Sequence, residues 1–246
     1  MPTAISRKNL LSNSIRVSFP YPELTFIRAV NNPIREEHPD SRRFLKDVGN
    51  WLDIKIESAT NPKYPNHSCV EVWEGRKYMS GINGAPCTQE LKKMARQHWE
   101  NANNFDYLVL GFTSEEHSRF KRFKLLERDN ILPVLIDANL SKHNCFEIIA
   151  DVGLRLPEMY FLGYPNANCI GCVKATSPTY WNHVREVHPK VFNARATQSR
   201  QIGAKLVRVK GQRLFLDELD PDAKGRPMKG LNFECGIFCE EKQLIV

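Results

Sequence analysis

Short apolar runs alternate with amphipathic stretches along the first two thirds of the chain, and this alternation restricts the fold more than any other feature. Strands are predicted at residues 24–30, 54–56, 107–112 and 131–136. The run at 107–112 is almost entirely apolar, which is typical of a central strand in a parallel sheet. Helices are predicted between them at residues 41–52, 88–101, 115–128 and 141–152. The alternation predicts an α/β fold with a mostly parallel sheet flanked by helices.

The last third of the chain has a different pattern. Two helices are predicted at 181–188 and 190–202, separated by Pro189, and a hairpin is predicted from strands at 204–209 and 213–216. We therefore expect two units. Residues 1–160 would form the α/β domain, and residues 161–246 a smaller cysteine-bearing unit.

Charge and hydropathy narrow the functional classes. The formal net charge is +7, which favours anionic partners such as nucleotides, phosphosulfates or nucleic acid. No apolar run approaches the roughly 18 residues of a membrane span, and no signal-peptide pattern follows the first residues. We expect a cytoplasmic protein without membrane partners. In that compartment thiols stay reduced, so the 7 cysteines indicate metal binding or catalysis instead of disulfides.

Four of these cysteines form two close pairs, and a fifth lies in a loop-like stretch. Paired thiolates with a second pair far along the chain are a common way to build a tetrahedral sulfur site. The pairs are Cys169 with Cys172 and Cys235 with Cys239, and the fifth is Cys87. The other two, Cys69 and Cys145, lie in helical patterns and are interpreted as core residues.

Five stretches together resemble the phosphoadenosine phosphosulfate (PAPS) reductase family, most closely its divergent members from phages and mobile elements. Their order along the chain also matches that family. The stretches are 36–40 (EEHPD), 84–92 (GAPCTQELK), 110–119 (LGFTSEEHSR), 163–172 (GYPNANCIGC) and 234–237 (ECGI). The resemblance implies a Rossmann-like fold of the PP-loop, adenine nucleotide alpha-hydrolase-like type.

One family hallmark is missing. The phosphate-binding Ser-Gly-Gly-x-Asp-Ser loop does not occur in this sequence. Residues 15–19 could supply its strand, but too few residues follow for a crossover helix. This departure argues against ordinary ATP hydrolysis or adenylation.

The resemblance also implies roles for particular residues. Cys87, Cys169 and Cys172 occupy positions that bind a [4Fe–4S] cluster in the branch that reduces adenosine phosphosulfate (APS). That branch has two adjacent cysteines where this chain has Pro86 and Cys87, so Cys239 or Cys235 would supply the fourth ligand. The alternative ligand set is the two pairs alone, and the alternative occupant is zinc, with free thiols as the third option.

Other positions would bind substrate or carry the chemistry. Cys235 matches the nucleophilic cysteine of the reductases, but Phe238 replaces the family histidine, and a role as a metal ligand is the favoured alternative. The basic residues expected to contact substrate are Lys92, Arg119, Arg122 and Lys174. Glu36 and Glu37 would contact a ribose or a metal, or form an exposed acidic helix start.

Two functions remain open at this point. The first is an enzyme that reduces an adenine sulfonucleotide or transfers sulfur, with thioredoxin or another thiol donor as partner. The second is a catalytically degenerate accessory protein, of the kind that accompanies phages and CRISPR loci. It would bind a nucleotide, a nucleic acid or a protein through the same fold and a structural metal site. A homodimer is compatible with either function.

Overall fold

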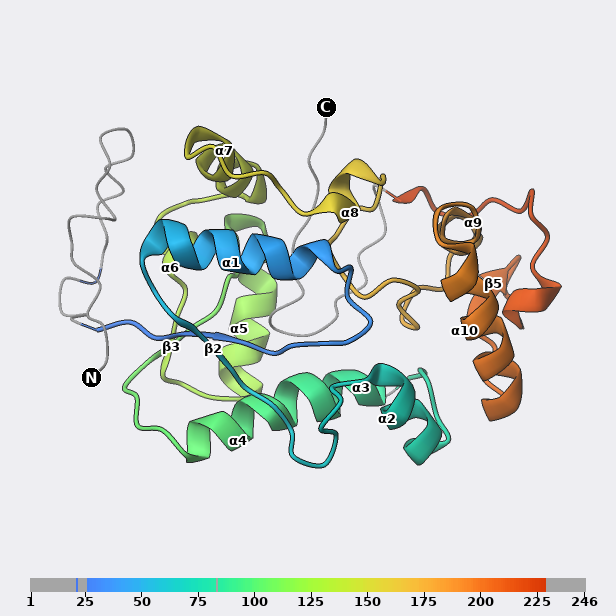
Figure 1. Cartoon of the computed structure of the whole chain (residues 1–246), viewed down its shortest axis with the longest axis horizontal. Coiled ribbons are helices and arrows are strands. Elements are labelled where there is room, and N and C mark those ends of the chain that lie inside the picture. Colours follow the sequence, from blue (N-terminus) through green and yellow to red (C-terminus); the bar gives the residue numbers. More distant parts are fainter. Residues whose placement is uncertain (1–20, 22–25, 83, 229–246) are drawn as a thin grey trace.

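A computed structural model describes residues 21, 26–82 and 84–228 of the chain. It has a mixed α/β architecture in which helices predominate and strands form small two-stranded sheets. Figure 1 shows helices α9 (Pro178–Val187) and α10 (Pro189–Ile202) gathered at one end of the long axis, away from α1 (Asp40–Leu52) and the first strands.

The first unit along the chain is a strand, a helix and a second strand. Strands β1 (Ala29–Asn31) and β2 (Ile56–Ser58) pair in parallel, with Ala29 opposite Ile56. Helix α1 connects them, as a parallel crossover requires. The predicted helix at 41–52 is therefore confirmed, and the strand predicted at 54–56 lies two residues later. Most of the strand predicted at 24–30 falls before β1 or outside the described residues.

A second parallel pair holds the most apolar run of the sequence. Strand β3 (Leu108–Val109) pairs with β4 (Ile131–Leu132) across the 3₁₀ turn η2 (Ser114–Glu116) and helix α5 (His117–Leu126). The run at 107–112 is not a central strand, because β4 is its one neighbour among the described residues and Val109 is 47% exposed. Strand β4 ends at Pro133, which has no N–H to donate, and a helical turn, α6 (Val134–Asp137), follows.

The helix predicted at 88–101 is confirmed as part of a longer segment. It begins with α3 (Pro86–Thr88), continues through the π-helix η1 (Gln89–Met94) and ends with α4 (Ala95–Asn101). Helix α2 (Cys69–Arg76) precedes it and packs on α3. Helices α7 (Lys142–Asp151) and α8 (Glu158–Phe161) follow the second parallel pair.

The pattern of the last third is confirmed within the described residues. Helices α9 and α10 each begin with a proline, whose missing N–H would have no partner there anyway. Gly203 ends α10 in the left-handed conformation, with φ +78°. Strands β5 (Val207–Val209) and β6 (Gln212–Leu214) form the expected antiparallel hairpin, followed by the turn η3 (Leu216–Glu218).

The larger hydrophobic core unites both parts of the sequence. It contains Ile34, Trp73 and Leu91 from the first 160 residues together with Trp181 and Leu206 from the remainder. A smaller core of Leu110, Phe112, Phe120 and Ile131 lies between the second strand pair and α5. This larger core contains residues from both sides of the boundary predicted at residue 160. The division into two units therefore stays a prediction. In the described part of the chain, no helix has the length and apolarity needed to cross a membrane.

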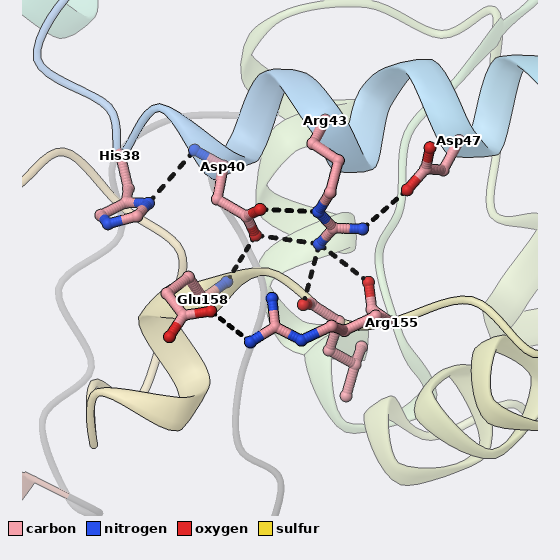
Figure 2. Close-up of polar contacts among 7 residues, drawn as sticks. His38, Asp40, Arg43, Asp47, Arg155 and Glu158 are labelled. Carbon is pink, nitrogen blue, oxygen red and sulfur yellow. Dashed lines mark hydrogen bonds and ion pairs between the residues drawn. The ribbon is translucent and has the colours of Figure 1, made fainter.

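One arginine ties α1 to the segment before α8. Figure 2 shows Arg43 donating to both carboxylate oxygens of Asp40, at 2.6 and 2.9 Å, and to Asp47 at 2.7 Å. The same guanidinium donates to the backbone carbonyls of residues 155–156, each at 3.0 Å. Asp40 in turn accepts from the backbone N–H of Glu158 at 2.8 Å. Arg43 thereby uses its planar fork to satisfy groups on two chain segments at once.

We expect Arg43→Ala to lower the free energy of unfolding by about 2 kcal/mol at neutral pH, since it removes both side-chain hydrogen bonds to Asp40 and leaves two backbone carbonyls without their donor. The hydrogen bond from Arg43 lowers the pKa of Asp40 from 3.8 to about 2. The folded state therefore favours the charged carboxylate. The contribution of the charged Asp40 carboxylate to stability is complete above about pH 4, and it is lost as the pH falls towards 2.

Urea unfolding at pH 7, 4 and 3 measures both effects. The wild type should lose more stability across this range than Arg43→Ala does. Arg155→Ala is the matched control, because its side chain is 53% exposed and its ion pair with Glu158 should contribute less than about 1 kcal/mol. Equal losses for the two variants would show that Arg43 does not hold the segments together.

Candidate thiol centre and adjoining cavity

Two of the cysteines lie at helix starts. Cys69 is the first residue of α2, and the Ser68 hydroxyl accepts from the N–H of Val70 at 3.2 Å. Cys87 follows Pro86 at the start of α3. The sequence folds this way because serine caps a helix well and proline suits the first helical position. Both thiols are buried, at 3% and 6% exposure.

The other two described thiols of interest share a loop. Cys169 and Cys172 are buried, at 6% and 4% exposure, in the segment between α8 and α9. The N–H of Cys172 donates to the Tyr180 hydroxyl at 2.9 Å. Gly171 turns the loop with φ +66°, and a Cβ there would lie only 3.1 Å from Val191. Glycine is therefore needed at this position for both its conformation and its size.

The structure brings these distant segments into one cluster of thiols. Cys69 hydrogen-bonds with both Cys169 and Cys87, and all four cysteines, Cys172 included, belong to the larger core. The contact with Cys169 lowers the pKa of Cys69, whereas the contact with Cys87 and burial raise it, and the net pKa lies well above the usual value. Without a nearby cation Cys69 is therefore a neutral thiol. We call Cys69, Cys87, Cys169 and Cys172 the thiol centre.

Glu36 connects two segments that carry the thiols, the start of α2 and the loop between Cys169 and Cys172. Its carboxylate accepts from the Ser68 hydroxyl at 2.7 Å and from the N–H of Cys69 at 2.8 Å. Its backbone carbonyl accepts from the N–H of Ile170, within the loop between Cys169 and Cys172, at 3.0 Å. One residue thus fixes the start of α2 against the cysteine loop. The sequence suggested a ribose or metal contact, or an exposed helix start, and not this tether.

We expect Glu36→Ala to lower the free energy of unfolding by about 1–2 kcal/mol, the usual cost of losing a helix-capping acceptor. Hydrogen exchange at the amides of Cys69 and Ile170 should also accelerate, because the two segments separate. Glu74→Ala, on the exposed side of α2, is the matched control and should change neither quantity. If the two variants behave alike, Glu36 is not a tether.

A cavity of about 310 Å³ adjoins the thiol centre. It is lined by Asn31 and Ser58, the last residues of β1 and β2, and by residues of the loop and first turn that lead into α1. Parallel sheets bind ligands at the carboxyl ends of their strands. Ile34 belongs both to this lining and to the core around the thiols, and Ala167 lines it two residues before Cys169. We call this space the strand-end cavity.

Lys92 is the one predicted substrate contact that lies beside this cavity. Its ammonium group is 3.8 Å from the carboxylate of Glu37, which lines the strand-end cavity. The lysine side chain is only 5% exposed. Lys92 lies in the π-helix η1, five residues after Cys87, and such helices occur frequently at functional sites. The ammonium charge of Lys92 therefore lies near the cavity.

The remaining predicted basic contacts lie elsewhere. Arg119 pairs with Glu116 at 3.0 Å and lies over the ring of Phe112, in the smaller core. Arg122 is exposed on α5. Lys174 is half-buried two residues after Cys172. None of these three lines the strand-end cavity.

The structure also changes the expected set of sulfur ligands. Cys69, interpreted from the sequence as a core residue, is buried as expected, but its thiol contacts Cys87 and Cys169. The signal that sequence reasoning missed was its position directly after a serine cap, which places Cys69 at the start of α2. Cys235 and Cys239 lie outside the described residues, so their roles stay predictions.

The four thiols suit a soft metal or an iron–sulfur cluster by their chemistry. Thiolate sulfur is the preferred donor for both, and a bound cation would offset the cost of ionising these buried thiols. Among residues 26–82 and 84–228, no three cysteine, histidine, aspartate or glutamate side chains already have the arrangement of a metal-ion site. The chemistry of the donor set therefore fits such a group.

Comparison with known proteins gives no relative from which to transfer a function: no family model, curated protein or solved structure matches this chain.

Proposed function

We propose that this chain is a divergent protein of the PAPS reductase type, which reduces an adenine sulfonucleotide or transfers sulfur with the help of a thiolate-bound iron–sulfur cluster. The observation that carries the proposal is that the Cys69 thiol contacts both Cys87 and Cys169, near a cavity at the ends of parallel strands. Cys69 would supply the fourth thiol that the resemblance left missing. An adenine nucleotide would occupy the strand-end cavity.

In this proposal Cys69, Cys87, Cys169 and Cys172 hold the cluster. A bound [4Fe–4S] cluster would supply redox capacity next to the substrate. Lys92 and Glu37 would orient the anionic end of the substrate, since the lysine ammonium is buried and near the cavity. The Cys235 thiolate would attack the sulfur of the sulfonucleotide, the S–O bond would break, and the nucleotide would leave with its phosphate. A dithiol donor such as thioredoxin would then release sulfite from the S-sulfonated cysteine and be oxidised to a disulfide.

Anaerobic purification followed by iron, zinc and sulfide analysis tests the metal. A broad absorption band near roughly 400 nm with equal amounts of iron and sulfide supports the cluster. Turnover of PAPS and APS with thioredoxin then tests the activity, and Cys235→Ser should abolish it. If Cys235→Ser instead strips the metal, Cys235 is a ligand and not the nucleophile.

A second function is favoured by one observation on the sequence. The chain lacks the Ser-Gly-Gly phosphate loop, which supports an accessory protein that binds a nucleotide, nucleic acid or partner without turnover. In that case the thiol centre would hold a structural zinc ion. Stoichiometric zinc, no colour and no turnover of either sulfonucleotide would favour this reading.

A further inference from the structure

A second, smaller cavity lies beside the strand-end cavity and is lined by basic side chains. Its volume is about 260 Å³, and its lining residues are Pro33, Ile34, Arg35, Arg42, Asn66 and His67. Pro33, Ile34 and Arg42 line the strand-end cavity as well. The two cavities are therefore neighbours that share these three lining residues.

The two arginines of this small cavity are not held in ion pairs. Among the described residues, neither Arg35 nor Arg42 makes a side-chain hydrogen bond or ion pair, whereas Arg43 next to them is fully engaged. Both side chains are exposed, so each guanidinium retains its five N–H donors for a ligand or for water. Two unpaired cations on one small cavity create a local positive potential that attracts an anion.

The acidic residues around the cavity have hydrogen-bond or ion-pair partners other than Arg35 and Arg42. The carboxylate of Glu36 accepts from Ser68 and Cys69, that of Glu37 faces Lys92, and that of Asp40 is held by Arg43. Glu71 accepts from Asn66 at the cavity wall. None of these carboxylates pairs with Arg35 or Arg42, so the positive potential is not cancelled by an ion pair.

Backbone amides contribute little to this cavity. The N–H groups of Asp40, Ser41 and Arg42, in the first turn of α1, are used in local bonds to His38 and Pro39. An anion in this cavity would therefore be bound by side chains instead of backbone amides. Arginine is suited to this task, because its planar fork matches the oxygens of a phosphate or sulfate group.

We propose that the small cavity binds a phosphate-type oxyanion of a mononucleotide whose nucleoside part occupies the strand-end cavity. Arg35 and Arg42 would take over the role of the missing phosphate loop with side chains in place of backbone amides. A volume of about 310 Å³ lies at the lower end for small-ligand pockets and suits one nucleoside better than a nucleic-acid strand. This inference deepens the proposed function and rests on its nucleotide substrate.

Calorimetric titration of the full-length protein tests the proposal with adenosine, adenosine 5′-monophosphate, adenosine 3′,5′-bisphosphate and inorganic phosphate. The phosphorylated nucleotides should bind at least tenfold more tightly than adenosine. The double variant Arg35→Gln/Arg42→Gln should lose this advantage while its affinity for adenosine stays unchanged. The matched control is Arg208→Gln/Lys210→Gln, which removes the same charge from exposed positions around the β5–β6 turn and should behave like the wild type.

Each other outcome has a defined meaning. Equal affinities for adenosine and its phosphates, equal losses in both double variants, or no binding of any anion would overturn the site. Tighter binding of a single-stranded oligonucleotide than of any mononucleotide would overturn the choice of ligand. If the double variant abolishes binding of inorganic phosphate while no nucleotide binds the wild type, the anion site stands and the nucleotide substrate of the proposed function fails. Metal content should be unchanged in both double variants, so loss of the thiol centre is recognised separately.

Discussion

Replacing Cys69 with serine is expected to remove most of the metal that the thiol centre would hold in the proposed function. The Cys69 thiol contacts both Cys87 and Cys169 from the start of α2, so it is the one residue whose loss separates the thiols of α3 from those of the loop. A serine hydroxyl is a harder and much less acidic donor, which soft metals and iron–sulfur clusters do not favour. Elemental analysis and the absorption spectrum of anaerobically purified protein measure the effect.

Cys145→Ser is the matched control for this substitution. Cys145 lies on α7, only partly buried and outside the larger core, and its replacement should leave the metal content unchanged. Full metal loading in Cys69→Ser, together with its loss in Cys235→Ser or Cys239→Ser, would show that the tail cysteines complete the ligand set. That result would restore the ligand set expected from the sequence.

Trp181→Ala is expected to lower the free energy of unfolding by about 3–5 kcal/mol, the usual cost of emptying a large core position. The Trp181 side chain is fully buried, and its indole N–H donates to the carbonyl of Ala175 at 2.8 Å. Its ring also packs near Gly171, in the cysteine loop. The variant should therefore loosen the loop of the thiol centre as well as the core, which denaturant unfolding and metal content measure together.

Trp99→Ala provides the comparison for this large effect. Trp99 is half-buried on α4, and its indole N–H donates to Glu57 at 3.2 Å. We expect a loss below about 2 kcal/mol and no change in metal content, since the side chain is far from full burial. Equal losses for the two tryptophans would contradict the assignment of Trp181 to the main core.

Local patterns predicted the helices better than the strands. The helix at 41–52 has clear apolar periodicity, and the helix at 190–202 has Pro189 and Gly203 to mark its ends; both occur as expected. The apolar runs predicted as strands were ambiguous, because a strand forms only where another strand pairs with it. The run at 107–112 forms only two residues of ladder, and residues 134–136 turn into a helix after Pro133.

The candidate site was predicted only in part for a similar reason. The short spacing between Cys169 and Cys172 marked a sulfur site in the sequence, and Cys87 was added through the resemblance. Cys69 had no such spacing partner, and only the packing of α2 against α3 brings it to the other thiols. Arg35 and Arg42 likewise became a candidate pair only because the loop before α1 folds back to place them on one cavity.

The sequence by itself determined the mixed helix and strand composition, the ends of the principal helices and the presence of closely spaced thiols. These properties depend on residues within a few positions of one another. The tertiary structure alone decided which thiols meet, which cations remain unpaired and where the cavities lie. Such contacts join residues that are tens to more than a hundred positions apart, as Cys69 and Cys169 are. Their proximity depends on burial of a common core and not on any local preference.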